Sequence, residues 1–379
     1  MKVFVMRMLG SLWVVPILFF LGLSSLSPAF IAQAQDNRQS KLQGSHGDRS
    51  VMPKSCRACH RGMVMKITGE EQVCLQCHGS AQDRQNMVSR GYLKATATGD
   101  VQDIGEALRK PYRHPVLTVR GVHQGGEALP EEVSNAARHA ECVDCHESHE
   151  VEKGKPFRGL KGRRIGNFVA EIEKEYELCY KCHSSSANLP TDATNKHAEF
   201  KITNPSFHPV EGEGRNHYVI SLMEPYNERE EQPGDIAILT CSDCHGNDDP
   251  NGPKGPHGSI YEGLLVRNYE MEDHRPESPQ AYALCYRCHD RSSILGNESF
   301  PYHALHIVGN PGNNELGTSC FTCHDAHGST KYQYLIRFNE EFVSPNEDDK
   351  LEFRATGVAT RHGECLLNCH GIEHNPRSY

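Results

Sequence analysis

Beyond residue 35, hydrophobic positions form short periodic segments separated by stretches with no regular pattern. The clearest helical pattern covers residues 167–183, where Phe168, Ile172 and Tyr176 recur at the spacing of one helix face. Charged residues lie between them, as on the exposed side of an amphipathic helix. The pattern therefore predicts a helix over 167–183.

Two further segments carry weaker patterns. Ser278 and Pro279 are typical of a helix start, and they predict a helix that runs to His289. Residues 334–338 and 351–353 predict two strands of a short hairpin. Elsewhere the 33 glycines and 21 prolines favour long loops. We therefore expect a mostly irregular fold with short α-helices and minor β-structure.

The longest apolar run, residues 9–23, lies near the N-terminus. Lys2 and Arg7 precede it, and Ala-Gln-Ala at 32–34 is typical of a cleavage site. We interpret residues 1–34 as a signal peptide, because the run is short for an uncleaved membrane anchor. No later stretch is long and apolar enough to cross a bilayer. We therefore expect an exported mature chain without a transmembrane segment, in the periplasm or outside the cell.

Composition changes this picture in two respects. Only 37% of the residues are hydrophobic, which is too few for a large aliphatic core, so a bound apolar group should supply part of the buried surface. Disorder is the alternative for such a composition, but sixteen regularly placed cysteines argue against it. The formal net charge of −9 lacks the basic footprint of nucleic-acid binding, so we expect no nucleic acid partner.

Every cysteine belongs to one kind of motif. Seven motifs read Cys-x-x-Cys-His, and the eighth has one extra residue between its cysteines. The cysteine pairs are Cys56 and Cys59, Cys74 and Cys77, Cys142 and Cys145, Cys179 and Cys182, Cys241 and Cys244, Cys285 and Cys288, Cys320 and Cys323, and Cys365 and Cys369. The histidines that directly follow are His60, His78, His146, His183, His245, His289, His324 and His370.

This motif has the chemistry of covalent haem attachment. Two thiols on a short helical turn add to the two vinyl groups of a haem, and the histidine that follows binds the iron as proximal ligand. Disulfides, zinc sites or iron–sulfur clusters are the alternatives, but none requires a histidine eight times at one offset. The sequence therefore predicts eight haem c groups. At about 43 residues per haem, the macrocycles should touch and form much of the core.

Fifteen of the 23 histidines remain for the opposite faces of the irons. From residue 100 onward a unit repeats: a leading histidine, a first motif, a trailing histidine and a second motif. The distal ligand candidates from leading and trailing positions are His114, His149, His208, His257, His303, His306 and His327, and His46 precedes the first motif in the same way. His139 and His374 are further candidates beside motifs. Met63 and Met65 are weaker rivals, so mainly bis-histidine, low-potential haems are expected.

The repeat divides the mature chain into four dihaem segments, namely an N-terminal unit over 35–100 and repeats over 101–200, 201–295 and 296–379. The N-terminal unit has one evident distal histidine, His46. Its second should come from His123, His139 or His374, or from a neighbouring subunit. We therefore expect this unit to contain either an open iron or a subunit junction.

The segment Cys-Phe-Thr-Cys-His-Asp-Ala-His-Gly-Ser at 320–329, with Leu-Cys-Tyr-x-Cys-His at 178–183 and 284–289, resembles the doubled-CXXCH family of multihaem c-type cytochromes. The resemblance is to octahaem members of the metal-reducer type, and it covers most of residues 46–379. It implies a multihaem cytochrome c fold wrapped around a haem chain, with bis-histidine haems in stacked and T-shaped pairs. It also implies periplasmic or extracellular electron transfer.

An electron carrier without catalytic residues is the function that these features favour. Its partners would be redox proteins, a porin–cytochrome conduit or an extracellular acceptor. Two alternatives stay open. One is a multihaem reductase of a small nitrogen or sulfur oxyanion, which needs one iron with an open face. The other is a homopolymer, in which the chain is the subunit of a conductive cytochrome filament.

Overall fold

The computed structural model describes residues 42–67, 69–117, 140–152, 154–155, 157–164, 167–169, 172–185, 194–216, 219–226, 238–356, 362–369 and 371–379. All of them lie in one compact unit, Leu42–Tyr379. Within these ranges no helix combines the length and the apolar character that a membrane span needs. The predicted signal peptide, His123, His139 and His370 lie outside the described residues.

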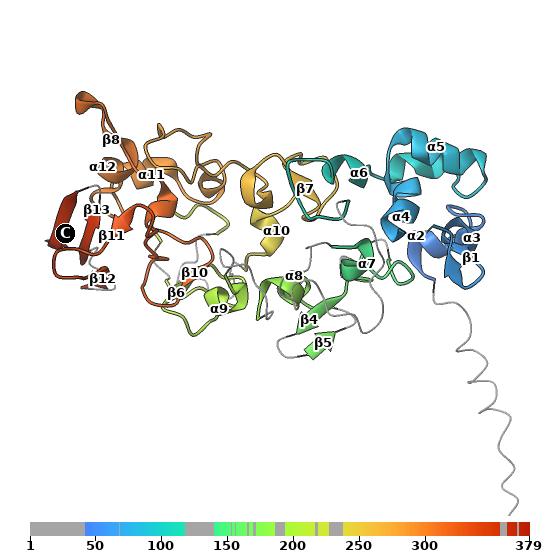
Figure 1. Cartoon of the computed structure of the whole chain (residues 1–379), viewed down its shortest axis with the longest axis horizontal. Coiled ribbons are helices and arrows are strands. Elements are labelled where there is room, and N and C mark those ends of the chain that lie inside the picture. Colours follow the sequence, from blue (N-terminus) through green and yellow to red (C-terminus); the bar gives the residue numbers. More distant parts are fainter. Residues whose placement is uncertain are drawn as a thin grey trace, which may run out of the picture. The chain divides into compact units, whose positions relative to one another are not determined.

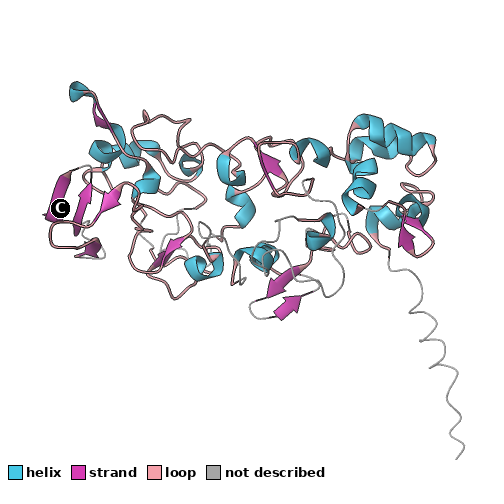
Figure 2. Ribbon diagram, viewed as in Figure 1, coloured by secondary structure: helices cyan, strands magenta, loops and turns pink. Residues whose placement is uncertain are grey.

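Helices are short, and loops connect most of them (Figures 1 and 2). The α-helices are α2 (Gly44–Gly47), α3 (Ser55–Cys59), α4 (Glu70–His78), α5 (Ala81–Ser89), α6 (Ile104–Ala107), α7 (Cys142–Cys145), α8 (Glu175–His183), α9 (Lys196–Phe200), α10 (Cys241–Cys244), α11 (Arg291–Leu295) and α12 (His303–Val308). The 3₁₀ helices are η1 (Ala95–Asp100), η3 (Glu262–Leu264), η4 (Cys285–Arg287), η5 (Pro311–Asn313) and η6 (Cys320–Thr322). The prediction of a mostly irregular fold with short helices is confirmed.

Most strands have two or three residues, and every strand pairing among the described residues is antiparallel. The two-stranded pairs are β1 (His60–Arg61) with β2 (Val64–Met65), β3 (Tyr112–Arg113) with β7 (Gly258–Ser259), β4 (Gly162–Arg164) with β5 (Asn167–Val169), β6 (Ser206–Phe207) with β10 (Gly328–Ser329), and β8 (Gly309–Asn310) with β9 (Glu315–Leu316). The largest sheet centres on β13 (Gly363–Cys369), which pairs with β11 (Val343–Ser344), β12 (Glu352–Ala355) and β14 (Ile372–Ser378).

Ordinary hydrophobic packing is concentrated near the N-terminus. A cluster of Met52, Ala58, Met87, Leu93 and Ala97 is buried beside α3, α5 and η1. Helix α5 begins at a capping box, in which Ser80 and Asp83 satisfy each other's backbone N–H groups. This small core fits the low hydrophobic content, which leaves little aliphatic surface for the rest of the chain.

Two strand pairings join distant segments in one recurring pattern. β3 directly precedes His114 and pairs with β7, which directly follows His257. β6 directly precedes His208 and pairs with β10, which directly follows His327. Each pairing sets the leading histidine of one repeat beside the trailing histidine of the next. Consecutive repeats are therefore interlocked by backbone hydrogen bonds.

Glycine is required at the start of β7 and of β10, because each strand lies against the backbone of an earlier segment of the chain. A Cβ atom on Gly258 would lie 1.8 Å from the carbonyl oxygen of Ala107, and one on Gly328 would lie 2.2 Å from that of Glu199. Both glycines directly follow a trailing histidine. The repeated His-Gly-Ser text thus reflects a close backbone approach that no larger residue permits.

The helix predicted over 167–183 is wrong in its first half. Residues 167–169 form β5, and α8 begins only at Glu175. The carboxylate of Glu177 accepts hydrogen bonds from the backbone N–H groups of Glu173 at 2.7 Å and Lys174 at 3.2 Å. This capping interaction fixes the helix start, because it satisfies donors that a longer helix would direct to preceding carbonyls.

The helix predicted from Ser278 to His289 is also replaced by turns. Ser278 does act as a cap, since its hydroxyl accepts from the backbone N–H of Ala281 at 3.0 Å. However, the N–H of Leu284 donates to the carbonyl of Asn268 at 3.0 Å instead of continuing a helical ladder. Only η4 is helical within the predicted span.

The hairpin predicted between 334–338 and 351–353 is absent from the described residues. Phe353 lies in β12 and pairs with Cys365 of β13. The two segments meet through side chains, because the rings of Tyr332 and Tyr334 lie 6.2 and 6.3 Å from that of Phe353. Aromatic side chains therefore join these two segments, which the sequence pattern predicted to pair through the backbone.

Candidate metal centres

Six of the motifs form a tight helical turn. Three of these turns are the short α-helices α3, α7 and α10, two are the 3₁₀ helices η4 and η6, and one is the last turn of α8. In five of them the backbone N–H of the motif histidine donates to the carbonyl of the first cysteine. The donors are His60, His146 at 2.9 Å, His245 at 2.8 Å, His289 at 3.0 Å and His324 at 2.9 Å. A seventh motif, Cys74–His78, closes α4. This turn brings the two cysteines of a motif close together in the backbone.

Each motif histidine that the structure describes has a second imidazole facing it. The pairs, with the distance between ring centroids, are His60 and His149 at 5.9 Å, His78 and His46 at 6.1 Å, His146 and His257 at 6.3 Å, His183 and His114 at 6.3 Å, His245 and His327 at 6.1 Å, His289 and His208 at 6.4 Å, and His324 and His303 at 6.4 Å.

This separation fits an iron between the rings. An iron–nitrogen bond of about 2 Å on each side, plus about 1 Å from nitrogen to ring centre, places the centroids about 6 Å apart. Rings in van der Waals stacking contact would lie closer. The donor set also fits, because imidazole is a common ligand of haem iron.

Burial keeps nine of these imidazoles in the neutral form that metal binding requires. It lowers the pKa to about 4 for His78, His183, His245, His257, His289 and His303. It also lowers the pKa of His146, His208 and His324. At neutral pH these rings therefore present a lone pair.

The facing partners follow a rule that the linear order of the sequence does not suggest. The leading histidines His46, His114 and His208 face the second motif of their own repeat. The trailing histidines His149, His257 and His327 instead face the first motif of the preceding repeat. Interlocked strands adjoin His257 and His327, and a backbone hydrogen bond from the N–H of Gln43 to the carbonyl of His149 joins the N-terminal unit to the next repeat.

In the N-terminal unit, where one distal histidine was evident, a second imidazole faces both His60 and His78. His149, which follows the third motif, faces His60 of the first motif. The repeat over 296–379 departs from this rule. There His303, in a leading position, faces the first motif histidine, His324.

Backbone carbonyls orient several of the facing imidazoles, and these were not predicted. The Nδ1 atom of His46 lies 2.8 Å from the carbonyl oxygen of Ser148, and that of His114 lies 2.7 Å from Pro256. His208 makes the same bond to Ala326. Each carbonyl belongs to the residue before a trailing histidine. A hydrogen bond at Nδ1 fixes the ring and leaves Nε2 for a metal.

Consecutive motifs lie next to one another. The thiols of Cys179 and Cys241 are in contact, and so are those of Cys285 and Cys320. Side chains also tie neighbouring motifs, because Lys181 Nζ donates to the carbonyl of Asp144 at 2.6 Å and Ser242 Oγ donates to Glu175 at 2.8 Å. At the junctions between the third and fourth, fourth and fifth, and sixth and seventh motifs, consecutive motifs therefore lie side by side.

The eighth motif differs from the others. Cys365 and Cys369 lie on the extended strand β13, with a register shift between Cys365 and Leu367, and not on a helical turn. An extended backbone separates two cysteines four residues apart more than a helical turn does, so these two do not fit the attachment geometry of the other motifs in this conformation. His306 and His374 lie near this strand, and burial followed by the charge of His306 lowers the pKa of His374.

The methionine rivals find no support in the geometry. The Met63 side chain is 97% exposed, and Met65 pairs with His60 through the backbone of β2. His149 already occupies the position opposite His60.

Two comparisons bear on this arrangement. Residues 135–188 match the family described as doubled CXXCH motif. Residues 166–335 match the family described as outer membrane cytochrome MtrC/MtrF-like, domains II/IV. The chain is a multihaem c-type cytochrome. Haem c is its cofactor, and electron transfer with redox partners is the work that such a cytochrome performs. No curated protein and no solved structure matches this cytochrome.

Proposed function

We propose that this cytochrome is an exported octahaem electron carrier whose irons are held mainly between two histidines. The observation that carries the proposal is the set of seven facing imidazole pairs, each joining a motif histidine to a histidine far along the chain. Chance packing of histidines does not produce one separation seven times, with a motif member in every pair.

The ligand sets follow from the pairs. We assign His149, His46, His257, His114, His327, His208 and His303 as distal ligands to the haems of His60, His78, His146, His183, His245, His289 and His324, in that order. We propose that Cys365 and Cys369 leave the extended conformation of β13 when they bind the eighth haem, and for this haem, whose proximal ligand is His370, we assign His306. His306 has a leading position in its repeat, and its Nδ1 atom lies 2.8 Å from the carbonyl oxygen of Tyr302, which leaves Nε2 for a metal.

Bound haem supplies a reversible one-electron couple at each motif. The protein's part is to place the motifs side by side, to supply two neutral imidazoles for each iron and to fix their orientation. Contacts between the third and fourth, fourth and fifth, and sixth and seventh motifs support a path in sequence order, which we propose to run from Cys56 to Cys369. Two strong nitrogen donors without methionine favour low potentials.

The pairs favour a carrier over a reductase. A reductase needs an iron with one open face, whereas at the seven motifs whose histidine the structure describes a second imidazole covers that face. His149 also gives the haem of His60 a distal ligand from the same chain, so this haem needs no ligand from a neighbouring subunit. The match to outer membrane cytochromes supports an extracellular acceptor, reached directly or through a porin–cytochrome conduit.

The proposal is tested by the redox behaviour of the purified holoprotein. We expect intact mass to show eight covalent haems, and the fully reduced protein to be reoxidised by a ferric chelate without a bound intermediate. Nitrite and hydroxylamine should be turned over no faster than in a haem-only control. Steady catalytic reduction of either compound, with a stoichiometric high-spin iron signal, would show an enzyme instead.

A further inference from the structure

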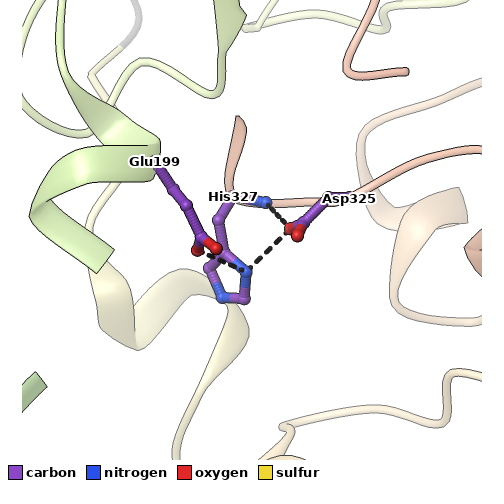
Figure 3. Close-up of side chains that lie close together, drawn as sticks. All are labelled: Glu199, Asp325 and His327. Atoms are coloured by element: carbon purple, nitrogen blue, oxygen red, sulfur yellow. Dashed lines mark hydrogen bonds and ion pairs between the residues drawn. The ribbon is translucent and has the colours of Figure 1, made fainter. Parts of the chain in front are cut away.

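One distal candidate, His327, has a different environment at Nδ1 from the histidines that meet backbone carbonyls. Its Nδ1 atom lies 3.0 Å from Oδ1 of Asp325 and 3.7 Å from Oε2 of Glu199 (Figure 3). The backbone N–H of His327 also donates to Asp325 Oδ1, at 2.9 Å. Both acidic residues are buried, with 8% and 5% of their surface exposed. Two carboxylates therefore lie behind the ring that faces His245.

The three residues resemble a small cation site, but their charges are already matched. Arg337 Nη1 lies 2.9 Å from Glu199 Oε1 and 2.5 Å from Asp325 Oδ2, and Lys196 Nζ lies 2.7 Å from Glu199 Oε2. Lys196 Nζ is also 3.3 Å from His327 Nδ1, yet an ammonium group and an imidazole N–H are both donors. With Nε2 used for a metal, Nδ1 carries the proton, and Asp325 is its acceptor.

Asp325 acts through a short sequence unit. It directly follows the motif histidine His324 and stands two residues before His327. Glu147 has the same place between His146 and His149, and its Oε1 lies 3.1 Å from His149 Nδ1. There the ring is exposed, with 51% of the side-chain surface accessible, and Lys161 shares the carboxylate at 3.0 Å. The buried version of the unit is the one at Asp325.

We propose that Asp325 is a positioning residue that holds the His327 ring by a buried N–H to carboxylate hydrogen bond and lowers the reduction potential of the haem between His245 and His327. The inference rests on the proposed function, because it requires that haem. A carboxylate acceptor raises the basicity of the other ring nitrogen, and a more basic ligand favours ferric over ferrous iron. Glu199, Arg337 and Lys196 keep Asp325 in place.

The consequence is an uneven chain of haems. The haem of His245 is the fifth of eight in the proposed order, and its distal ligand alone, among the described pairs, donates to a buried carboxylate. The haems served by His46, His114 and His208 have backbone carbonyls at the same position. A low-potential haem in the middle of the path would divide the haems into two groups that accept electrons separately.

The test compares spectroelectrochemical titrations of the wild-type holoprotein, Asp325→Asn and Asp325→Glu. Asparagine keeps the size and an acceptor oxygen but removes the charge. We expect one-eighth of the optical change to move to higher potential in Asp325→Asn, by about tenfold in the reduction equilibrium constant, or 59 mV for one electron. Asp325→Glu should restore most of the wild-type curve. The matched control is Asp290→Asn, because Asp290 also directly follows a motif histidine but caps α11 through Ser292 and Ser293.

Several outcomes decide the proposal. A superimposed Asp325→Asn titration, or an equal shift in Asp290→Asn, would overturn it. One new high-spin iron in Asp325→Asn with all haems retained would support it, since the ring would then have left the iron. If Asp325→Asn does not mature, Glu199→Gln is measured, and the same component must shift upward by a smaller factor. A wild-type protein without covalent haem would instead refute the proposed function.

Discussion

The imidazole rings of His60 and His149 face each other at 5.9 Å with only 11° between their planes, although His60 ends the first motif and His149 follows the third. The same crossing recurs for His146 with His257 and for His245 with His327. On the proposed ligand assignment, each of these repeats therefore completes the ligand set of the one before it. The repeats are dependent units, and the damage from one substitution should appear one repeat away.

Replacement of His149 tests this directly. His149→Ala should open the iron at His60 and leave the iron at His146, three residues away, unchanged. We expect one new high-spin signal that is lost again when the haem site of Cys56 and Cys59 is also removed. The control is His362→Ala, because His362 Nδ1 lies 2.8 Å from the carbonyl oxygen of Tyr379 and its ring faces no motif histidine among the described pairs. A signal that depends on Cys142 and Cys145 would contradict the exchange.

The angles between paired rings predict two classes of low-spin haem. Pairs that cross a repeat boundary are nearly parallel, at 11°, 10° and 7°. The other four described pairs are inclined, at 78°, 61°, 46° and 47°. Parallel imidazoles lift the degeneracy of the iron d orbitals more than crossed ones. Oxidised protein should therefore give both rhombic and strongly axial low-spin spectra at low temperature, and a single spectral class would contradict the assigned geometry.

The glycines at the interlocking strands should be sensitive to enlargement. Gly328→Ala places a methyl group against the carbonyl of Glu199, 2.2 Å away before relaxation. We expect a loss of about 1–3 kcal/mol in the free energy of unfolding, because backbone must shift to make room. Gly99→Ala is the control, since nothing lies within 4 Å of its added Cβ. Denaturant titration of both holoproteins measures the difference, and equal stability would show that the strand pairing is loose.

Two histidines, His306 and His374, are candidate distal ligands of the last haem, and single substitutions distinguish them. Since His306 has the leading position, His306→Ala should create one high-spin iron, and His374→Ala should leave the spectrum unchanged. His374 is a demanding control, because its Nδ1 atom is buried without a hydrogen-bond partner in the described part of the chain. High-spin iron in His374→Ala alone would reverse the assignment.

The motifs and the pool of distal histidines could be predicted from sequence, because thioether attachment demands a fixed local spacing. The pairing of each candidate with a particular motif was not predicted, and the structure places His46, His114 and His208 opposite a motif of their own repeat. The partners of His257 and His327 could not be predicted, since they depend on backbone pairing between repeats and not on distance along the chain. In the sequence, that pairing is reflected by the glycines that directly follow His257 and His327.

Regular structure was predicted less well, for a related reason. Leu284 and Phe353 carry helix and strand patterns, but their backbone partners, Asn268 and Cys365, lie in distant loops and strands. Where little aliphatic core exists, local propensity does not decide the pairing. The extended backbone at Cys365 and Cys369 has the same origin, since β13 is held by three neighbouring strands.

Spin-quantified low-temperature EPR of the fully oxidised wild-type protein tests the central claim most directly. If each iron lies between two imidazoles, all haem is low-spin, and eight low-spin irons are counted per chain. A high-spin signal equal to one iron or more per chain, sensitive to added nitrite or hydroxylamine, would contradict the account.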